Sequence, residues 1–416
     1  MKRGQITAIL LVLTLAIAAL SFTGCTSGET TTPGSPFVGG TNGILMSFLE
    51  GNPPAEVTDD KTYPFNVVVK VKNDGEANIR SSTLKITLSG FDPKEFGFSD
   101  GGAEAITNTL KEELTATRKD VEGNTIEGST VYMTFPPEDS GLPPFEYTGK
   151  LSGNTPFTIR ADACYLYGTQ ANAKLCLKRN VLEPDKKGGV CKVTESKTVY
   201  NSGGPVQVTS LKESVGGQGK VSITFTLEHK GNGKIYLAES TGYRVPRDSP
   251  LCGKDEKGRE SVLKKDMIGV VIETGMEGLT CTGISGIPEG VVLYLNENTV
   301  EDLTGKMFSR AVDVSLLTAR VAFTKSTSTQ SHVGYNLGYI KLYDGSRTVT
   351  CMQRVDSIGS STAEKVLNIY LIYNYKEDIS QQILVKHAGG YEDDESSGYN
   401  YPSASGSGGV GTGIGS

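Results

Sequence analysis

The histidines and cysteines of this sequence are the side chains most able to do chemistry. There are 3 histidines and 7 cysteines among 416 residues. His229 ends a strand-like run, His332 lies in a Ser/Thr/Gln-rich loop, and His387 lies near the end of the predicted folded part. No two histidines are close in sequence, and none has a serine or cysteine partner that would make a nucleophile and its base. We therefore predict that the protein is not an enzyme.

Metal and cofactor sites are not expected either. The sequence has no Cys-x-x-Cys motif beside a histidine, no phosphate-binding loop, no dinucleotide fingerprint and no EF-hand loop. The acidic residues Asp59, Asp60, Glu377 and Asp378 could hold Ca²⁺ at a sheet edge, but we interpret them as solvated surface charge. The prediction is a protein without a bound cofactor or metal.

Six of the cysteines follow the middle of the first predicted domain: Cys164, Cys176, Cys191, Cys252, Cys281 and Cys351. An even number of cysteines in an exported chain favours disulfides over zinc ligands or buried thiols. Gly168-Thr169-Gln170 resembles a hairpin turn, which would place Cys164 and Cys176 on opposed strands. Cys281 and Cys351 lie in strand-like runs of the second half, whereas Cys191 and Cys252 lie in loop-like sequence. The predicted pairs are Cys164–Cys176, Cys281–Cys351 and Cys191–Cys252.

The elements that position these residues begin after an apparent export signal. Lys2 and Arg3 precede an apolar run from Ile6 to Phe22, which a small residue and Cys25 follow. Residues 1–25 resemble a lipoprotein signal, in which Cys25 would carry the lipid. Residues 26–43 are rich in Thr, Ser, Gly and Pro, which predicts a flexible tether. The partner implied is the membrane, through an N-terminal lipid or helix.

Two other interpretations of this segment stay open. The apolar run could be an uncleaved transmembrane helix, although it is slightly short for one. The motif Lys2-Arg3-Gly4-Gln5 resembles the prepilin-type signal of archaeal pilins, which is cut between Gly4 and Gln5. The chain would then be a pilin-like filament subunit. The even number of the remaining cysteines favours lipid on Cys25.

Composition predicts an all-β protein. The chain has 51 glycines and no tryptophan, and its short Val/Ile/Thr/Tyr runs are separated by Gly, Pro, Asn and Asp. Residues 103–118 form the one short helix expected in the first domain, and residues 299–311 a second helix beyond it. The net charge is −6 without a basic patch, so we expect no nucleic-acid partner.

An internal repeat divides the chain. Residues 64–79 and 221–235 each alternate apolar and polar side chains, turn at a glycine and resume at an isoleucine. Gly75 and Gly231 are 156 positions apart in this alignment. The Tyr-x-Tyr motifs of residues 157–177 and 366–385, each interpreted as a hairpin, are 208 apart. The difference predicts an insertion of about 52 residues in the second copy, between Cys281 and Cys351.

The motif Val-x-Val-x-Asn-x-Gly after a Pro-rich lead-in resembles the opening of CARDB-type immunoglobulin-like domains of archaeal and bacterial surface proteins. The resemblance covers residues 62–90 and 219–240. It implies seven-stranded sandwiches with roles in adhesion, spacing or scaffolding, and it supplies no catalytic residues. The layout as a whole is similar to that of archaeal surface lipoproteins.

The predicted architecture is therefore two immunoglobulin-like β-sandwich domains in tandem after an N-terminal hydrophobic signal or anchor helix. Domain one is expected at residues 44–178, a linker at 179–203, domain two at 204–388 and a disordered tail at 389–416. The expected function is non-catalytic binding, adhesion or scaffolding at the extracytoplasmic face of the membrane. The expected ligand is a surface protein or a glycan.

Overall fold

The computed structural model of the chain is all-β. It describes residues 34–99, 102–184, 189–238, 252–253, 264–285, 330–332, 335–356, 358–359 and 362–388. Every described strand belongs to one compact unit, residues 37–416. No helix among the described residues is long and apolar enough to span a membrane. The predicted signal helix, Cys25, residues 299–311 and the tail from residue 389 lie outside the described residues.

The strands form three larger sheets and one hairpin. A three-stranded sheet has the order β1 (Ile44–Phe48), β3 (Val67–Asn73), β8 (Thr130–Phe135). A five-stranded sheet has the order β10 (Glu195–Ser196), β12 (Val206–Gly217), β13 (Lys220–His229), β19 (Ser346–Arg354), β16 (Leu279–Thr282). The ten-stranded sheet follows the path β17 (Gln330–His332), β18 (Tyr335–Lys341), β15 (Met267–Glu273), β20 (Ala363–Lys386), β9 (Thr155–Leu177), β4 (Leu84–Ser89), β5 (Thr107–Thr109).

The remaining elements are short. β11 (Val199–Asn201) pairs with β9, whereas β14 (Lys234–Leu237) and β2 (Glu56–Thr58) pair with β20. β6 (Arg118–Lys119) and β7 (Thr125–Ile126) form the hairpin. Two 3₁₀ helices, η2 (Pro93–Phe96) and η3 (Glu138–Ser140), lie in loops.

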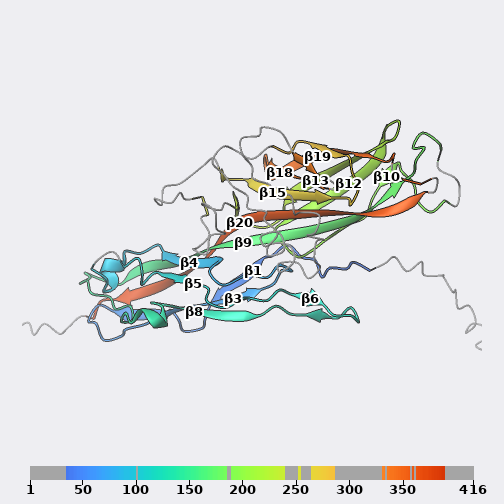
Figure 1. Cartoon of the computed structure of the whole chain (residues 1–416). Helices are drawn as coiled ribbons and strands as arrows, with labels where there is room; N and C mark the ends of the chain where they lie inside the picture. Colours follow the sequence, from blue (N-terminus) through green and yellow to red (C-terminus); the bar gives the residue numbers. More distant parts are fainter. Residues whose placement is uncertain are drawn as a thin grey trace, which may run out of the picture. The chain divides into compact units, whose positions relative to one another are not determined.

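Two long strands, β9 and β20, form the centre of the ten-stranded sheet (Figure 1). β9 has 23 residues and β20 has 24, several times the average strand. They pair antiparallel without a break, from Leu177 opposite Ala363 to Thr155 opposite Val385. At about 3.3 Å per residue, such a ladder is roughly 75 Å long.

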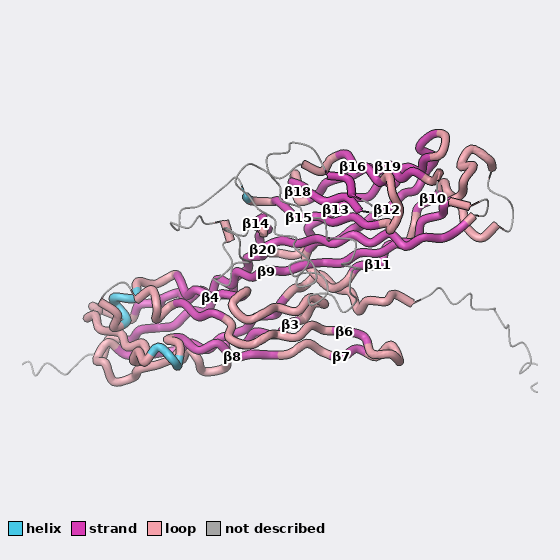
Figure 2. Tube along the Cα trace, in the orientation of Figure 1, coloured by secondary structure: helices cyan, strands magenta, loops and turns pink. Residues whose placement is uncertain are grey.

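The β9–β20 ladder serves both halves of the fold (Figures 1 and 2). In the first half, β4 pairs with the N-terminal part of β9 and β2 pairs with the C-terminal end of β20. In the second half, β15 pairs with the N-terminal part of β20 and β11 with the C-terminal part of β9. The three-stranded sheet packs with the first half and the five-stranded sheet with the second. Each half therefore contains part of both long strands.

Alternating burial fixes the register of this ladder. Ile159, Ala161 and Ala163 of β9 are buried, as are Ile383 and Val385 of β20, whereas the residues between them are wholly or partly exposed. A slip of one residue would move every apolar side chain to the opposite face, so the core specifies a single register.

The internal repeat is visible in the pairing. Leu166 of β9 lies directly opposite Asn374 of β20, and these two positions differ by the same 208 residues that align the two Tyr-x-Tyr motifs. Antiparallel pairing of two equivalent strands around equivalent residues relates the copies by a pseudo-twofold axis at this point. The repeat therefore brings its two tyrosine motifs together instead of placing them in separate domains.

The predicted hairpins at residues 157–177 and 366–385 are wrong, because each segment is one continuous strand. Gly168 and Thr169, interpreted as a turn, pair with Ile372 and Leu371 instead. A partner strand about 200 residues away supplies hydrogen bonds along the whole segment, which a locally judged turn signal does not reveal.

The predicted helix at residues 103–118 is also wrong. Residues 103–106 form turns, and β5 follows them. The apolar residues Ile106, Leu110 and Leu114 are four apart, a spacing that keeps side chains on one side of an extended chain as well as on one face of a helix. Leu114 bridges Ile79 in extended conformation. Within the predicted linker, β10 and β11 are paired strands.

Candidate functional site

Four tyrosines meet at the centre of the ladder. Tyr165 lies opposite Tyr375, and Tyr167 lies opposite Tyr373. All four are at most 1% exposed, and their ring centroids are 5.7 to 6.3 Å apart in edge-on or tilted contacts. Burial raises the pKa of all four phenols. We call these residues the tyrosine cluster.

The repeat explains two glycines that face the tyrosine cluster. The backbone N–H of Ala77 donates to the Tyr167 hydroxyl at 3.3 Å, and that of Gly233 donates to the Tyr375 hydroxyl at 2.7 Å. A Cβ at Gly75 would collide with the first hydroxyl, and a Cβ at Gly231 with the second. Both glycines are therefore needed because a phenol occupies the space of their missing side chains.

A carboxyl group and an imidazole complete the hydrogen bonding of the cluster. Tyr165 donates to Glu377 Oε1 at 2.7 Å, and His229 Nε2 lies 3.0 Å from the Tyr375 hydroxyl. Burial raises the pKa of Glu377 to about 7 and lowers that of His229. These are acid and base groups, but every one of them is engaged with a buried phenol. The cluster therefore joins the two halves through hydrogen bonds and ring contacts.

A second carboxylate fixes the segment that leads into β1. Glu76 accepts hydrogen bonds from the backbone N–H groups of Val38, Gly39 and Gly203 at 2.9, 2.8 and 2.7 Å. The carbonyl of Gly40 accepts from the backbone N–H of Gly204 at 3.1 Å. The flexible tether predicted to extend to residue 43 is therefore fixed over residues 38–43, which we call the N-terminal strap.

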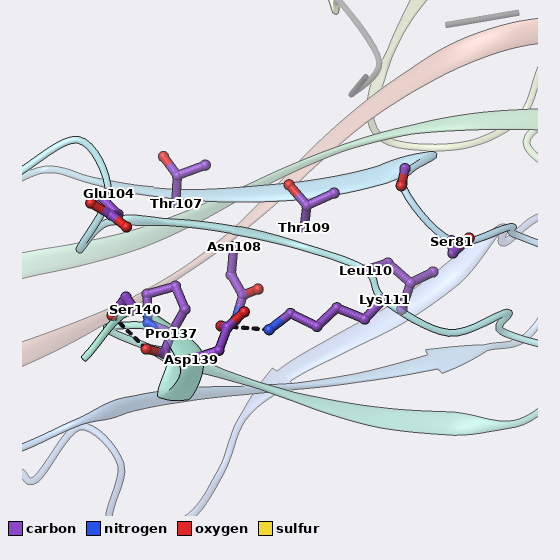
Figure 3. A pocket seen from close by; sticks show the side chains of 11 residues that line it. Ser81, Glu104, Thr107, Asn108, Thr109, Leu110, Lys111, Pro137, Asp139 and Ser140 are labelled. Carbon is purple, nitrogen blue, oxygen red and sulfur yellow. Dashed lines mark hydrogen bonds and ion pairs between the residues drawn. The ribbon is translucent and has the colours of Figure 1, made fainter. Parts of the chain in front are cut away.

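An open polar groove lies where the chain around β5 meets the loop after β8 (Figure 3). It has a volume of about 470 Å³ and is lined by Ser81, Ser82, Glu104, Thr107, Asn108, Thr109, Leu110, Lys111, Pro137, Asp139 and Ser140. Lys111 Nζ lies 2.5 Å from Asp139 Oδ1 across the groove, and this hydrogen bond lowers the pKa of Asp139. Asn108 Nδ2 donates to the Thr134 carbonyl at 2.9 Å.

The polar groove offers hydrogen-bonding groups to a ligand. Its hydroxyl and amide groups can donate to and accept from a polar ligand. Both members of its ion pair are more than half exposed, so the pair adds little stability.

The disulfides differ from the sequence prediction. The structure joins Cys281 to Cys351, as predicted, and these two residues are direct cross-strand partners. The predicted pairs Cys164–Cys176 and Cys191–Cys252 are wrong. Cys164 pairs with Cys252 and Cys176 with Cys191. The correction follows from the fold, because positions 164 and 176 lie 12 residues apart on one extended strand and cannot approach each other.

Asp59, one of the acidic residues that could hold Ca²⁺ by sequence, has protein partners instead. Asp59, interpreted from the sequence as solvated charge, is only 1% exposed. It accepts from His387 Nδ1 at 2.7 Å and from the backbone N–H groups of Ala388 and Leu151 at 2.8 and 3.0 Å. These hydrogen bonds, and most strongly the one with His387, hold the pKa of Asp59 well below its usual range. Within the described ranges, no group of three or more His, Cys, Asp or Glu could hold a metal ion.

The sequence did not predict Glu213 and Glu76, two carboxylates that link distant segments of the fold. Glu213 is fully buried, accepts from the Cys176 N–H at 2.8 Å and lies 3.0 Å from Lys197 Nζ. Burial raises its pKa to about 7. Glu76 gives no sequence signal at all, because its donors are backbone groups of distant segments. The repeated Tyr-x-Tyr motif is a sequence signal that could have predicted the pairing of β9 with β20, since the two copies lie opposite each other.

Comparison with known proteins adds no relative: no family model matches the chain, and no curated protein matches its sequence.

Proposed function

We propose that this is an exported, membrane-tethered scaffold or adhesion protein without catalytic activity, whose halves are immunoglobulin-like sandwiches of the CARDB type. The observation that carries the proposal is the continuous β9–β20 ladder. A ladder shared by both halves makes one stiff body, which suits presenting binding surfaces at a distance from a membrane.

The cysteines support export. Three disulfides join six cysteines in this chain. Disulfides persist in oxidising compartments and are rare in the reducing cytosol. The remaining cysteine, Cys25, ends the predicted signal and would carry the lipid anchor.

A membrane partner through Cys25 and a surface protein or glycan as ligand complete the proposal. The polar groove is the candidate for a small polar ligand. The many structural hydrogen bonds of the buried acids support a role without catalysis, because those groups are already engaged.

Fractionation of producing cells tests the proposal, with Cys25→Ala as the variant and Thr26→Ala as the matched control. We expect the wild type and the control in the membrane fraction, accessible to external protease and with a lipid adduct on Cys25 by intact mass. The Cys25→Ala chain is expected in the medium. A wild-type chain that stays in the cytosol with reduced cysteines would contradict the proposal.

A pilin-like filament subunit is the second candidate, because the N-terminal strap is fixed to the body. Pilin heads receive their N-terminal segment without a long flexible tether, and Glu76 accepts two hydrogen bonds from this strap and a third from Gly203. The same mass measurement separates the candidates, since a mature chain that begins at Gln5 supports the filament subunit and excludes the lipoprotein.

A further inference from the structure

The outer face of the five-stranded sheet carries three Thr-x-Thr pairs on neighbouring strands. They are Thr224 and Thr226 of β13, Thr348 and Thr350 of β19, and Thr280 and Thr282 of β16. The residues between the members of each pair, Phe225, Val349 and Cys281, are buried. The six threonines therefore share the outward side, and we call them the threonine face.

The threonine face is a regular array. Thr224 lies opposite Thr350 with their Oγ1 atoms 3.2 Å apart, and Thr226 lies opposite Thr348 with 3.3 Å between the same atoms. Thr282 Oγ1 donates to the Thr350 carbonyl at 3.1 Å. Neighbouring strands are about 4.8 Å apart and alternate residues about 6.8 Å apart. Because branching at Cβ restricts χ1, the hydroxyl and methyl groups are held in place.

The array keeps most of its hydrogen-bonding capacity for an external partner. Each hydroxyl has one donor and two acceptor sites. The Thr224–Thr350 pair uses one donor and one acceptor, and so leaves one donor and three acceptors. Thr280, Thr282 and Thr348 are exposed, and the other three threonines are partly exposed.

The fold itself does not require threonine at these positions. At the corresponding outward positions of the three-stranded sheet, β3 carries Val68 and Lys70 and β8 carries Tyr132 and Thr134, so three of these four residues are not threonine. A cross-strand threonine pair makes only a small contribution to the stability of a sheet. The density of hydroxyl groups is therefore a property of this face rather than of the repeat.

Charge selects the kind of partner. The six threonines carry no ionisable group, and Glu228, the next outward residue of β13, is already paired with Lys230. Lys212 of β12, opposite Thr224, is the other ionic side chain beside the array. A surface made of uncharged hydroxyls and methyls complements a neutral, hydroxyl-rich polymer.

We infer that the threonine face binds a neutral polysaccharide, through hydrogen bonds to sugar hydroxyls and contacts of threonine methyl groups with sugar C–H groups. The inference rests on the proposed function, since it names the partner class of a protein displayed outside the cell. It concerns a surface distinct from the polar groove.

A pull-down of the purified full chain on insoluble cellulose, chitin and curdlan tests the inference. The variant replaces four residues, Thr224→Val, Thr226→Val, Thr348→Val and Thr350→Val, because valine keeps the shape and branching while removing the hydroxyls. The control is Thr130→Val with Thr134→Val, on β8 of the first half. We expect the wild type and the control to bind at least one polymer and the fourfold variant to bind at least tenfold more weakly.

Circular dichroism and melting temperature verify that the fourfold variant is folded. If it does not fold, single Thr226→Val and Thr348→Val variants, each expected to bind several-fold more weakly, replace it. Wild-type chain that none of the three polymers retains would overturn the inference, as would undiminished binding by the folded variants. Hexose increments on the threonine face in native protein would also overturn it, since the hydroxyls would then be attachment points. None of these results bears on the membrane fractionation, so the proposed function is judged separately.

Discussion

At the scale of single residues, buried acids and phenols hold the centre of this molecule. Glu377 and Tyr165 form one hydrogen bond at 2.7 Å, and burial raises the pKa of Glu377 from 4.5 to about 7. A folded-state pKa above the unfolded one means that the folded chain binds the proton more tightly. The stabilisation is complete below about pH 4.5 and is lost as pH rises towards 7.

We therefore expect Glu377→Gln to flatten the pH dependence of stability. Between pH 5 and 8 the free energy of unfolding of the wild type should fall by up to about 3 kcal/mol through this group. Glutamine keeps an acceptor for Tyr165 and does not ionise, so the variant should lose less. Urea unfolding at several pH values measures both. Glu213 also has a raised pKa and remains in the variant, so the difference between the two chains is the quantity to compare.

The hydroxyl of Tyr375 gives a second prediction at this scale. Tyr375→Phe keeps the ring contacts but leaves the backbone N–H of Gly233 without its 2.7 Å acceptor. A fully buried donor left unpaired costs about 1–3 kcal/mol, and because Gly233 is only partly buried we expect a loss near the lower end of that range. The exposed Tyr132→Phe is the control and should change stability by less than about 0.5 kcal/mol. Equal stability of both variants in urea would contradict the role given to the phenol.

At the scale of elements, alternation in the sequence predicted several strands well and failed where distant pairing decides. The runs around Val67–Asn73 and Lys220–His229 are strands, because apolar residues at every second position form one buried face. The continuous strands β9 and β20 were not predictable locally. A glycine and polar residues within β9 resemble a turn until a second long strand covers them.

The disulfide connectivity follows from those two strands and is directly testable. Proteolysis of the non-reduced protein should yield the linked peptides Cys164–Cys252, Cys176–Cys191 and Cys281–Cys351 in mass spectrometry. A Cys164–Cys176 peptide would contradict a continuous β9, because an extended strand keeps these residues far apart. Reduced and alkylated protein is the control for peptide assignment.

At the scale of the whole molecule, the ladder decides how the chain unfolds. The sequence predicted two tandem domains, residues 44–178 and 204–388. In the structure, Leu175 and Leu177 of β9 are fully buried in the part of the ladder that pairs with the N-terminal part of β20. Cutting the chain between the expected domains would expose these residues and remove hydrogen-bonding partners from both long strands.

We therefore predict that residues 37–203 and residues 204–388, produced separately, will each fail to fold, because each lacks half of the ladder. Produced together, they should associate into one particle with the circular dichroism of the intact chain, since β9 and β20 can still pair. Calorimetry of the uncut chain should show one transition whose calorimetric and van't Hoff enthalpies agree. Two separate transitions, or a cooperative melt of either fragment alone, would mean that the halves are stable without sharing strands and that the stiffness assigned to the scaffold has another source.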